Sequence, residues 1–542
     1  MTDNSNRHPS NKRDVSIPRR RFLQGTAAAG LFATTMPISS ISWSADGKKV
    51  LRARGRADLD KLDPGFYQNS YNVDVMNCIY SKLVHYKPGR KWGWELQAAE
   101  SIEQVDETRI RFKLRPGIMF TGGYGEMTAE DVKFSFERVI EHDSPIKGDW
   151  GPLDRVDVED KYTGVIVLKE PFQPLWNITL PYGAGHIVSK KAVMEATSNM
   201  ENTEPGGDFG MQPPCFSGPY VLEEWKPNQY ALLKKNPDYT GPDTAEFDEI
   251  RVIPMQDEKT AQIAYESGDI DYALISLSSL EKYKENPPKN TTIEEYPSLF
   301  YVWVGMNMDH PKLKDPNVRK AIQWAINVPQ ILETVYFGRA DVATGNIAPG
   351  LVGHRDKALI PPEGDLDKAR EYLDKAGVEN LQLTIDTLNA SKWKSIAEIV
   401  QAQLGQIGIQ LQINVQDSGS FWTLGMESEG DRWKDLQLIV NRFSMAPDPY
   451  YASQWFTCEQ VGVWNWERFC NERFDELNEK AVKESDPEKR DAMYREMQDL
   501  MEESGAYRFL THEATPIMYR DTKTTAAMRP DGNPLYRYFD SV

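Results

Sequence analysis

Four cysteines are the residues whose spacing most directly suggests chemistry in this 542-residue chain. Cys458 and Cys470 stand 12 positions apart, so in an oxidising compartment a disulfide between them would close a short loop. Such a bridge stabilises a fold by about 3 kcal/mol in the chain-entropy treatment. Cys78 and Cys215 form a second pair by elimination, and two buried free thiols are the alternative for them. Neither pair has the spacing or the accompanying histidines of a zinc site, so we expect no metal.

Catalytic motifs are missing from the sequence. It contains no Gly-x-x-x-x-Gly-Lys phosphate loop, no Gly-x-Ser-x-Gly nucleophile elbow and no His-Glu-x-x-His helix. Histidines stand singly, which is typical of packed or surface residues: His85, His142, His186, His310, His354 and His512. We therefore expect no catalytic residue, no cofactor and no enzyme, with a hydrolase or chaperone as a distant alternative.

The elements that must position any site alternate between strand and helix patterns. Residues 108–114 alternate apolar and charged side chains, as on a half-exposed strand, and residues 409–415 do the same. Thr128 and the pair Asp315-Pro316 are start signals for amphipathic helices. A helix over 367–376 is expected to end at Gly377. The pattern indicates a mixed α/β fold, and the length indicates two or more domains.

Charge is unevenly distributed along the chain. Residues 1–44 contain six basic and two acidic residues, a net charge of +4. Because the whole chain has a formal net charge of −18, the remainder carries a net charge of −22. A strongly acidic body argues against nucleic acid as a partner. After residue 44, no stretch is long and apolar enough to span a membrane.

The basic start has the layout of an export signal. A weakly apolar run over 22–33 and small residues over 42–45 follow it. Its arginine pair and the residues behind it resemble the twin-arginine signal: Arg19, Arg20, Phe22 and Leu23. No Cys precedes Cys78, so a lipid anchor is not expected. We expect cleavage between Ser42 and Asp46 and a mature protein that is free in the periplasm.

Three segments, over 96–102, 112–120 and 128–138, resemble the signature of the family 5 solute-binding proteins. Further landmarks in family order are 217–220, 236–239, 267–271, 306–307, 318–321 and 368–373. These proteins are receptors for dipeptides, oligopeptides, nickel chelates and some sugars or opines in ATP-binding-cassette importers. The Cys458 and Cys470 pair resembles that of the dipeptide-binding branch.

The resemblance implies a two-lobed α/β periplasmic binding protein (type II, cluster C-like) with a subdomain inserted in lobe I. The implied organisation is a signal over 1–44, lobe I over 45–85, the inserted subdomain over 86–209, lobe I again over 210–298, lobe II over 299–515 and a return to lobe I over 516–542. Hinge crossings are implied near 298–303 and 511–520. A monomer of this kind closes on its ligand and delivers it to an inner-membrane permease and ATPase complex.

Ligand identity is where this chain departs from the resemblance. In peptide receptors of the family, the ligand's α-amino group is held by an Asp four residues before a Pro of the segment that here covers 444–449. That Pro is Pro449 in this chain, and the position of the Asp is occupied by Met445. Asp448 is either a substitute or a turn residue before Pro449. A pocket Trp of the family is replaced by Ser418, with Trp422 nearby. We expect a peptide-like or opine-like solute, with a nickel chelate or an oligosaccharide as the alternative.

Candidate ligand-binding residues follow from the same resemblance. They are Tyr67, Gln68, Asn69 and Ser70 in lobe I, and Trp422, Met445, Trp464, Asn465 and Trp466 in lobe II. Either Lys392 or Lys394 could meet a ligand carboxylate.

Overall fold

The computed structural model describes residues 47–67, 69–142, 144–197, 207–243 and 245–542, and all of them belong to one unit, residues 44–542. The predicted export signal with Arg19, Arg20, Phe22 and Leu23, and the candidate Gln68, lie outside the described residues. Within the described ranges, no helix is long and apolar enough to cross a membrane.

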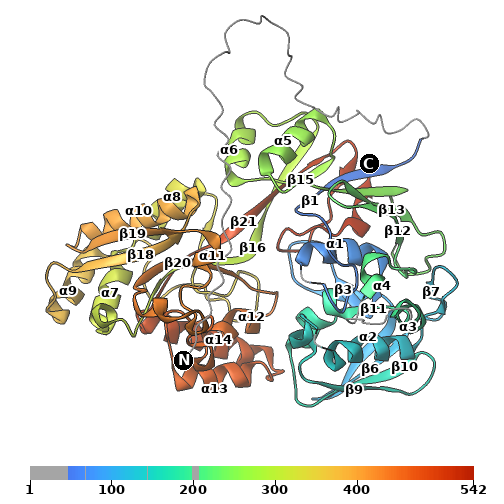
Figure 1. Cartoon of the computed structure of the whole chain (residues 1–542), viewed down its shortest axis with the longest axis horizontal. Coiled ribbons are helices and arrows are strands. Elements are labelled where there is room, and N and C mark those ends of the chain that lie inside the picture. The colour runs from blue at the N-terminus through green and yellow to red at the C-terminus, as the bar shows by residue number, and fades with distance from the viewer. Residues whose placement is uncertain (1–46, 68, 143, 198–206, 244) are drawn as a thin grey trace, which may run out of the picture. The chain divides into compact units, whose positions relative to one another are not determined.

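One large mixed sheet runs through the protein (Figure 1). Its strands follow the order β12 (Tyr220–Lys226), β13 (Tyr230–Lys235), β14 (Glu249–Pro254), β1 (Val50–Gly55), β15 (Tyr272–Leu274), β21 (Tyr507–Arg520), β16 (Thr291–Met306), β20 (Leu438–Ser444), β18 (Gln382–Leu388) and β19 (Gln410–Gln416). The central strands β16 and β21 are long and antiparallel, pairing from Thr291 with Arg520 to Gly305 with Tyr507. N-terminal strands continue the sheet on one side of this pair and C-terminal strands on the other, so two chain segments connect the halves.

Each half has its own hydrophobic core. The N-terminal core surrounds helix α1 (Ser70–Ile79) and helix α2 (Ala129–Glu141), and Met528, Tyr536 and Phe539 from the end of the chain join it. A smaller sheet packs with α2 in this half, in the order β5 (Ala99–Asp106), β6 (Arg109–Leu114), β10 (Thr163–Leu168) and β9 (Leu153–Val158).

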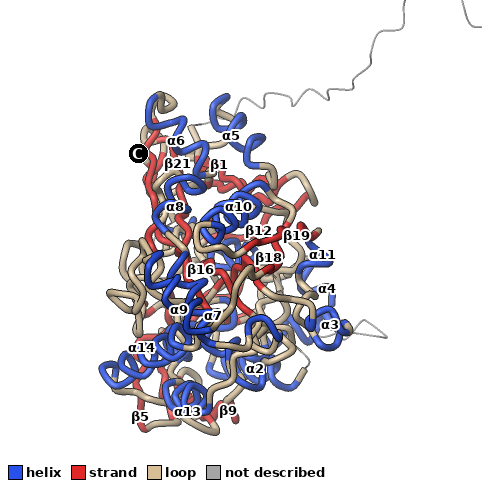
Figure 2. The backbone as a smooth tube through the Cα atoms, turned by 90° about the vertical axis from the view of Figure 1, so that its left-hand side faces the viewer, coloured by secondary structure: helices blue, strands red, loops and turns tan. Residues whose placement is uncertain are grey.

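The C-terminal half contains two further apolar clusters. One forms between the strands β18 to β20 and helices α7 (Pro316–Ala325), α8 (Val328–Tyr336), α9 (Leu366–Ala376) and α10 (Ser391–Gly405), with α10 lying on β18 and β19 (Figure 2). The other surrounds α13 (Glu472–Ala481) and α14 (Pro487–Glu503). The protein therefore has the two-lobed α/β fold that the resemblance implied.

Local sequence signals explain several element ends. The Thr128 hydroxyl and the Asp131 carboxylate form a reciprocal capping box at the start of α2. Asp315 caps α7 through the Asn317 amide at 2.8 Å. Helix α9 ends at Gly377, whose φ of 63° is a left-handed conformation that favours glycine. These start and stop predictions are confirmed, as are the strands expected over 108–114 and 409–415.

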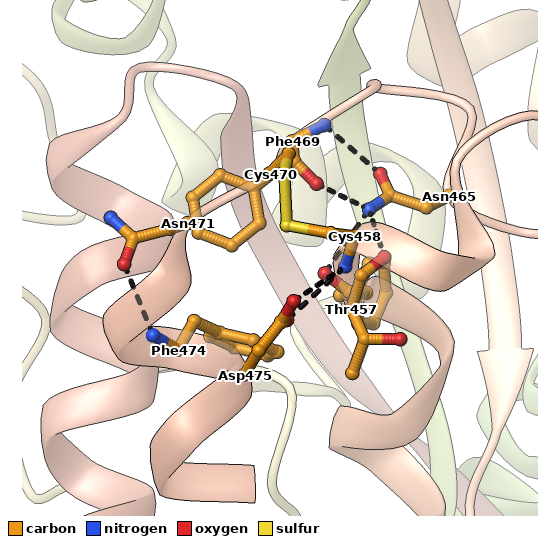
Figure 3. The surroundings of a disulfide bond; sticks show 9 residues. Thr457, Cys458, Asn465, Phe469, Cys470, Asn471, Phe474 and Asp475 are labelled. Atoms are coloured by element: carbon orange, nitrogen blue, oxygen red, sulfur yellow. Dashed lines mark hydrogen bonds between the residues drawn. A yellow bond between two sulfur atoms is a disulfide. The ribbon is translucent and has the colours of Figure 1, made fainter.

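The structure pairs Cys458 with Cys470 in a disulfide (Figure 3). Around it, the Cys458 amide donates to the carboxylate of Asp475 at 3.1 Å. The side-chain amide of Asn465 donates to the Phe469 carbonyl at 2.6 Å within the closed loop. The bond and these hydrogen bonds fix the loop against the start of α13.

Of the two alternatives for the second cysteine pair, the structure has the free thiols, because Cys78 and Cys215 are both buried and unbridged. The Cys78 thiol donates to the Asp74 carbonyl 3.6 Å away, one turn back in its own helix α1. Burial raises the pKa of both thiols to about 12, so neither is a reactive thiolate at neutral pH.

Replacing both disulfide cysteines, as Cys458→Ser with Cys470→Ser, is expected to lower the free energy of unfolding by about 2 to 3 kcal/mol, because the unfolded chain regains the entropy of the open loop. Urea unfolding followed by circular dichroism measures the loss. A reductant should shift the wild-type midpoint to that of the variant and leave the variant unchanged. A reductant effect of equal size on both proteins would contradict the prediction.

Candidate functional site

Three adjoining cavities lie where the two halves meet at strands β16, β20 and β21. The first is lined by Met445 and the second mainly by aromatic rings, and both are also lined by Phe300, Ser444 and Trp455. Arg442 lines both the second and the third. We call the three together the cleft, and name them the Met445 cavity, the aromatic cavity and the charged cavity.

The Met445 cavity, of about 310 Å³, takes residues from both halves. Ser70 comes from α1, while Met445 follows β20. Arg529 and Asp531 also line it, and both are buried and pair with each other at 2.6 Å. Asn533 donates its amide to Asp531 at 2.7 Å. The one carboxylate of this group is thus already neutralised and hydrogen-bonded.

A second carboxylate lies just behind this cavity. Asp74 on α1 is buried and 3.9 Å from the guanidinium of Arg56, which lines the cavity. Burial raises the pKa of Asp74 to about 7, although the Arg56 charge opposes the shift. Burial thus disfavours the ionised form of Asp74.

The aromatic cavity, of about 350 Å³, is lined mainly by rings, namely Phe300, Trp422, Phe443, Trp455 and Trp464. The rings of Trp464 and Phe443 meet edge to face with centroids 6.1 Å apart. The guanidinium of Arg442 lies 3.4 Å from the centroid of Phe300. Flat aromatic faces with one cation at the edge suit an apolar group next to an anion.

The charged cavity, of about 600 Å³, contains Lys392 at the start of α10, Arg442 on β20 and Glu513 on β21. Glu513 is buried and accepts hydrogen bonds from both cations, with Arg442 Nε at 2.7 Å. Burial by itself would raise the pKa of Glu513, but the charges of Arg442 and Lys392 outweigh it and hold that pKa below its ordinary value. The carboxylate is ionised and shared by two cations.

Residues 94–462 match the family described as bacterial extracellular solute-binding proteins, family 5, in its middle region. The chain belongs to this family. Among curated relatives of this family 5 protein is the glutathione-binding protein GsiB of Escherichia coli strain K12, 26% identical over 498 residues, which are 90% of this chain and 92% of the relative.

Solved structures give the same fold. HbpA2 from Haemophilus parasuis superposes with a TM-score of 0.79 at 20% identity, covering 91% of this chain and all of that one. DppA from Helicobacter pylori, solved in complex with the peptide STSA, superposes with a TM-score of 0.70 at 25% identity, covering 91% and 98%. The family is one of solute-binding proteins, and this family 5 chain is accordingly a substrate-binding protein.

The cleft of this family 5 protein brings together some of the predicted residues. Ser70, Met445, Trp422 and Trp464 line it. Of the two lysines considered for a ligand carboxylate, only Lys392 lines the charged cavity.

Other predicted residues lie outside the cleft lining. The Tyr67 side chain is buried, and its hydroxyl lies against the backbone of Gly183. The Asn69 amide donates to Asp60 at 2.6 Å. Asn465 and Trp466 are at most 1% exposed, and their polar groups bond carbonyls of the disulfide loop. The structure places these four side chains in local packing, not in the cavity walls.

Asp448, considered as a substitute for Met445, is buried and bound to Arg490 at 2.7 Å. Its carboxylate also accepts from the Tyr450 amide, so it does stand in a turn. Its charge is already neutralised inside the protein.

Sequence reasoning missed Phe300, Arg442, Glu513 and Arg529. Arg442 stands on β20 three positions before Met445, which directly follows that strand, so it could have been found by examining the strand that leads to Met445. The others come from segments far apart in sequence.

Proposed function

We propose that this protein is the periplasmic receptor of an ATP-binding-cassette importer, which captures a small peptide-like or opine-like organic solute and delivers it to an inner-membrane permease and ATPase complex. The observation that carries the proposal is the cleft itself. Residues from both halves line it, together with residues of β16 and β21, the two strands that connect the halves. Relatives whose names state glutathione or peptide binding support this solute class.

We also propose that the cleft opens and closes by a hinge in these two strands. Contacts between the halves outside the strands support closure: Tyr451 donates to Asp149 at 2.7 Å, and Asn177 donates to Asp448 at 3.0 Å. Lys483 pairs with Glu170 at 2.7 Å. The Lys483–Glu170 pair is exposed and can break and reform in water at low cost, as a reversible closure requires. The lobe boundaries stated from the sequence are part of this proposal.

Residues 1–44 are proposed as a twin-arginine export signal, which would place the mature protein in the periplasm. In that compartment the Cys458–Cys470 disulfide can form. Replacing Arg19 and Arg20 by lysine should leave unprocessed precursor in the cytoplasm, as measured by fractionation and immunoblotting.

Native mass spectrometry of protein purified gently from the periplasm tests the receptor function. A receptor should retain a stoichiometric small molecule, whose mass separates a peptide-like or opine-like solute from a nickel chelate or a sugar. Recovery of the bare chain, together with no binding in a titration against peptide and opine libraries, would contradict the proposal.

A further inference from the structure

We infer, resting on the proposed function, that the ligand is an organic carboxylate with an apolar, preferably aromatic, body and no ammonium group. An N-acylated amino acid or N-acylated short peptide has this chemistry.

The first observation is the arrangement of charges in the charged cavity. Two cations, Lys392 and Arg442, share the single carboxylate of Glu513. The Glu513 side chain is only 8% exposed, while those of Lys392 and Arg442 are 38% and 31% exposed. A ligand in the cavity therefore meets the cations and is shielded from the acid.

Geometry leaves donors for a ligand on the same cations. Arg442 uses its Nε for Glu513, and its terminal nitrogens make no hydrogen bond to any described residue. A guanidinium edge with free N–H groups binds a carboxylate in two parallel hydrogen bonds. The ligand carboxylate thus lies beside Glu513 and completes a cluster of two cations and two anions.

The other ionised side chains of the cleft offer little to an ammonium group. Asp531 is committed to Arg529 and Asn533. Glu258 lines the charged cavity from the exposed start of helix α5 (Glu258–Ser267), where water screens its charge. An ammonium in the Met445 cavity would also face Arg56 and Arg529. Burying an unpaired ammonium there is unfavourable.

The aromatic cavity would bind the apolar body of the ligand. Arg442 lines both this cavity and the charged one, so an apolar group among the rings stands next to a carboxylate on Arg442. Because three Trp side chains line the aromatic cavity, occupancy should change the intrinsic fluorescence.

Three probes that share the phenylalanyl-alanine body and carry a negative, no and a positive charge test the inference: N-acetyl-phenylalanyl-alanine, its C-terminal amide, and the amide without the acetyl group. Titrations by calorimetry and tryptophan fluorescence should give a Kd for the carboxylate that is about tenfold or more below that of the neutral amide, because hydrogen bonds to charged groups are strong. The cationic amide should bind most weakly. Equal affinity for carboxylate and amide, or tightest binding of the cation, would overturn the inference.

Variants locate the effect. Arg442→Gln and Lys392→Gln should each reduce the carboxylate-to-amide preference about tenfold, whereas Lys394→Gln, two residues along α10 and outside the cavity lining, should retain it. Glu513→Gln removes the competing acid and should increase the preference. Unfolding midpoints monitor folding of each variant. A preference that stays the same in all four variants would overturn the inference even if every probe binds.

The outcome also separates this inference from the proposed function. If no probe binds but native mass spectrometry finds another retained solute, the inference is wrong and the receptor function stands. If no probe binds and no solute is retained, both are wrong.

Discussion

Replacing Asp448 by alanine is expected to lower the free energy of unfolding by about 4 kcal/mol, because it leaves a buried guanidinium without its counter-charge. Asp448 is 0% exposed and Arg490 is 4% exposed, and they lie 2.7 Å apart. The same carboxylate accepts the Tyr450 amide at 3.0 Å, so a backbone donor is also left without its partner. Urea unfolding at pH 7, followed by circular dichroism, measures the loss.

An exposed pair provides the matched control. Glu476 and Lys480 form an ion pair whose side chains are both about half exposed, so Glu476→Ala should change stability far less than Asp448→Ala does. A double variant, Asp448→Leu with Arg490→Met, removes both charges and should recover most of the loss. A loss below about 1 kcal/mol in Asp448→Ala would show that water reaches Arg490 and would contradict the prediction.

The same pair explains why the sequence could not decide the role of Asp448. A carboxylate before a proline is equally compatible with a turn and with a ligand anchor. The deciding partner, Arg490, lies 42 positions away on helix α14. A sequence pattern records the acid but not the cation that neutralises it.

Signals that act over a few residues predicted the fold well. Caps such as Asp315 and the left-handed end at Gly377 need only the local backbone, and both are present as expected. The order of the strands in the sheet could not be predicted from such local signals, because it depends on pairings between distant segments. The long pair β16 and β21 joins residues about 200 positions apart, and only the family resemblance predicted crossings there.

The cleft shows the same division between local and distant information. Met445 and Trp464 could be predicted because both stand in segments that the resemblance aligns. Trp466 could not be separated from Trp464, since the loop turns one ring to the aromatic cavity and the other to a core around Phe421. Glu513 contacts Arg442 only through the pairing of the central strands.

The sequence could not decide between a second bridge and two free thiols, and the reason is physical. An even number of cysteines permits two bridges but gives no geometric evidence for the second. Cys78 packs inside α1 and bonds within that helix, and buried free cysteines behave as small apolar residues.

Replacing Glu467 by glutamine is expected to stabilise the protein at alkaline pH. Glu467 is 1% exposed; one of its carboxylate oxygens accepts from Trp303 Nε1 at 2.8 Å, and the other has no hydrogen-bond partner among the described residues. Burial raises the pKa of Glu467 from 4.5 to about 7, although the Trp303 hydrogen bond opposes the shift. The folded protein therefore holds a proton that the unfolded chain releases between pH 4.5 and 7.

The sign of the pH dependence follows from this difference. Below pH 4.5 both states are protonated and burial of the acid costs little, whereas above pH 7 the folded state must bury an ionised carboxylate. Glutamine keeps the acceptor for Trp303 and carries no charge, so its advantage over Glu467 should be about 2 kcal/mol larger at pH 8 than at pH 5. Urea unfolding midpoints at the two pH values measure it, with the exposed Glu476→Gln as the matched control. An advantage that is equal at both pH values would contradict the prediction, because it would mean that Glu467 has the same pKa in the folded and the unfolded protein.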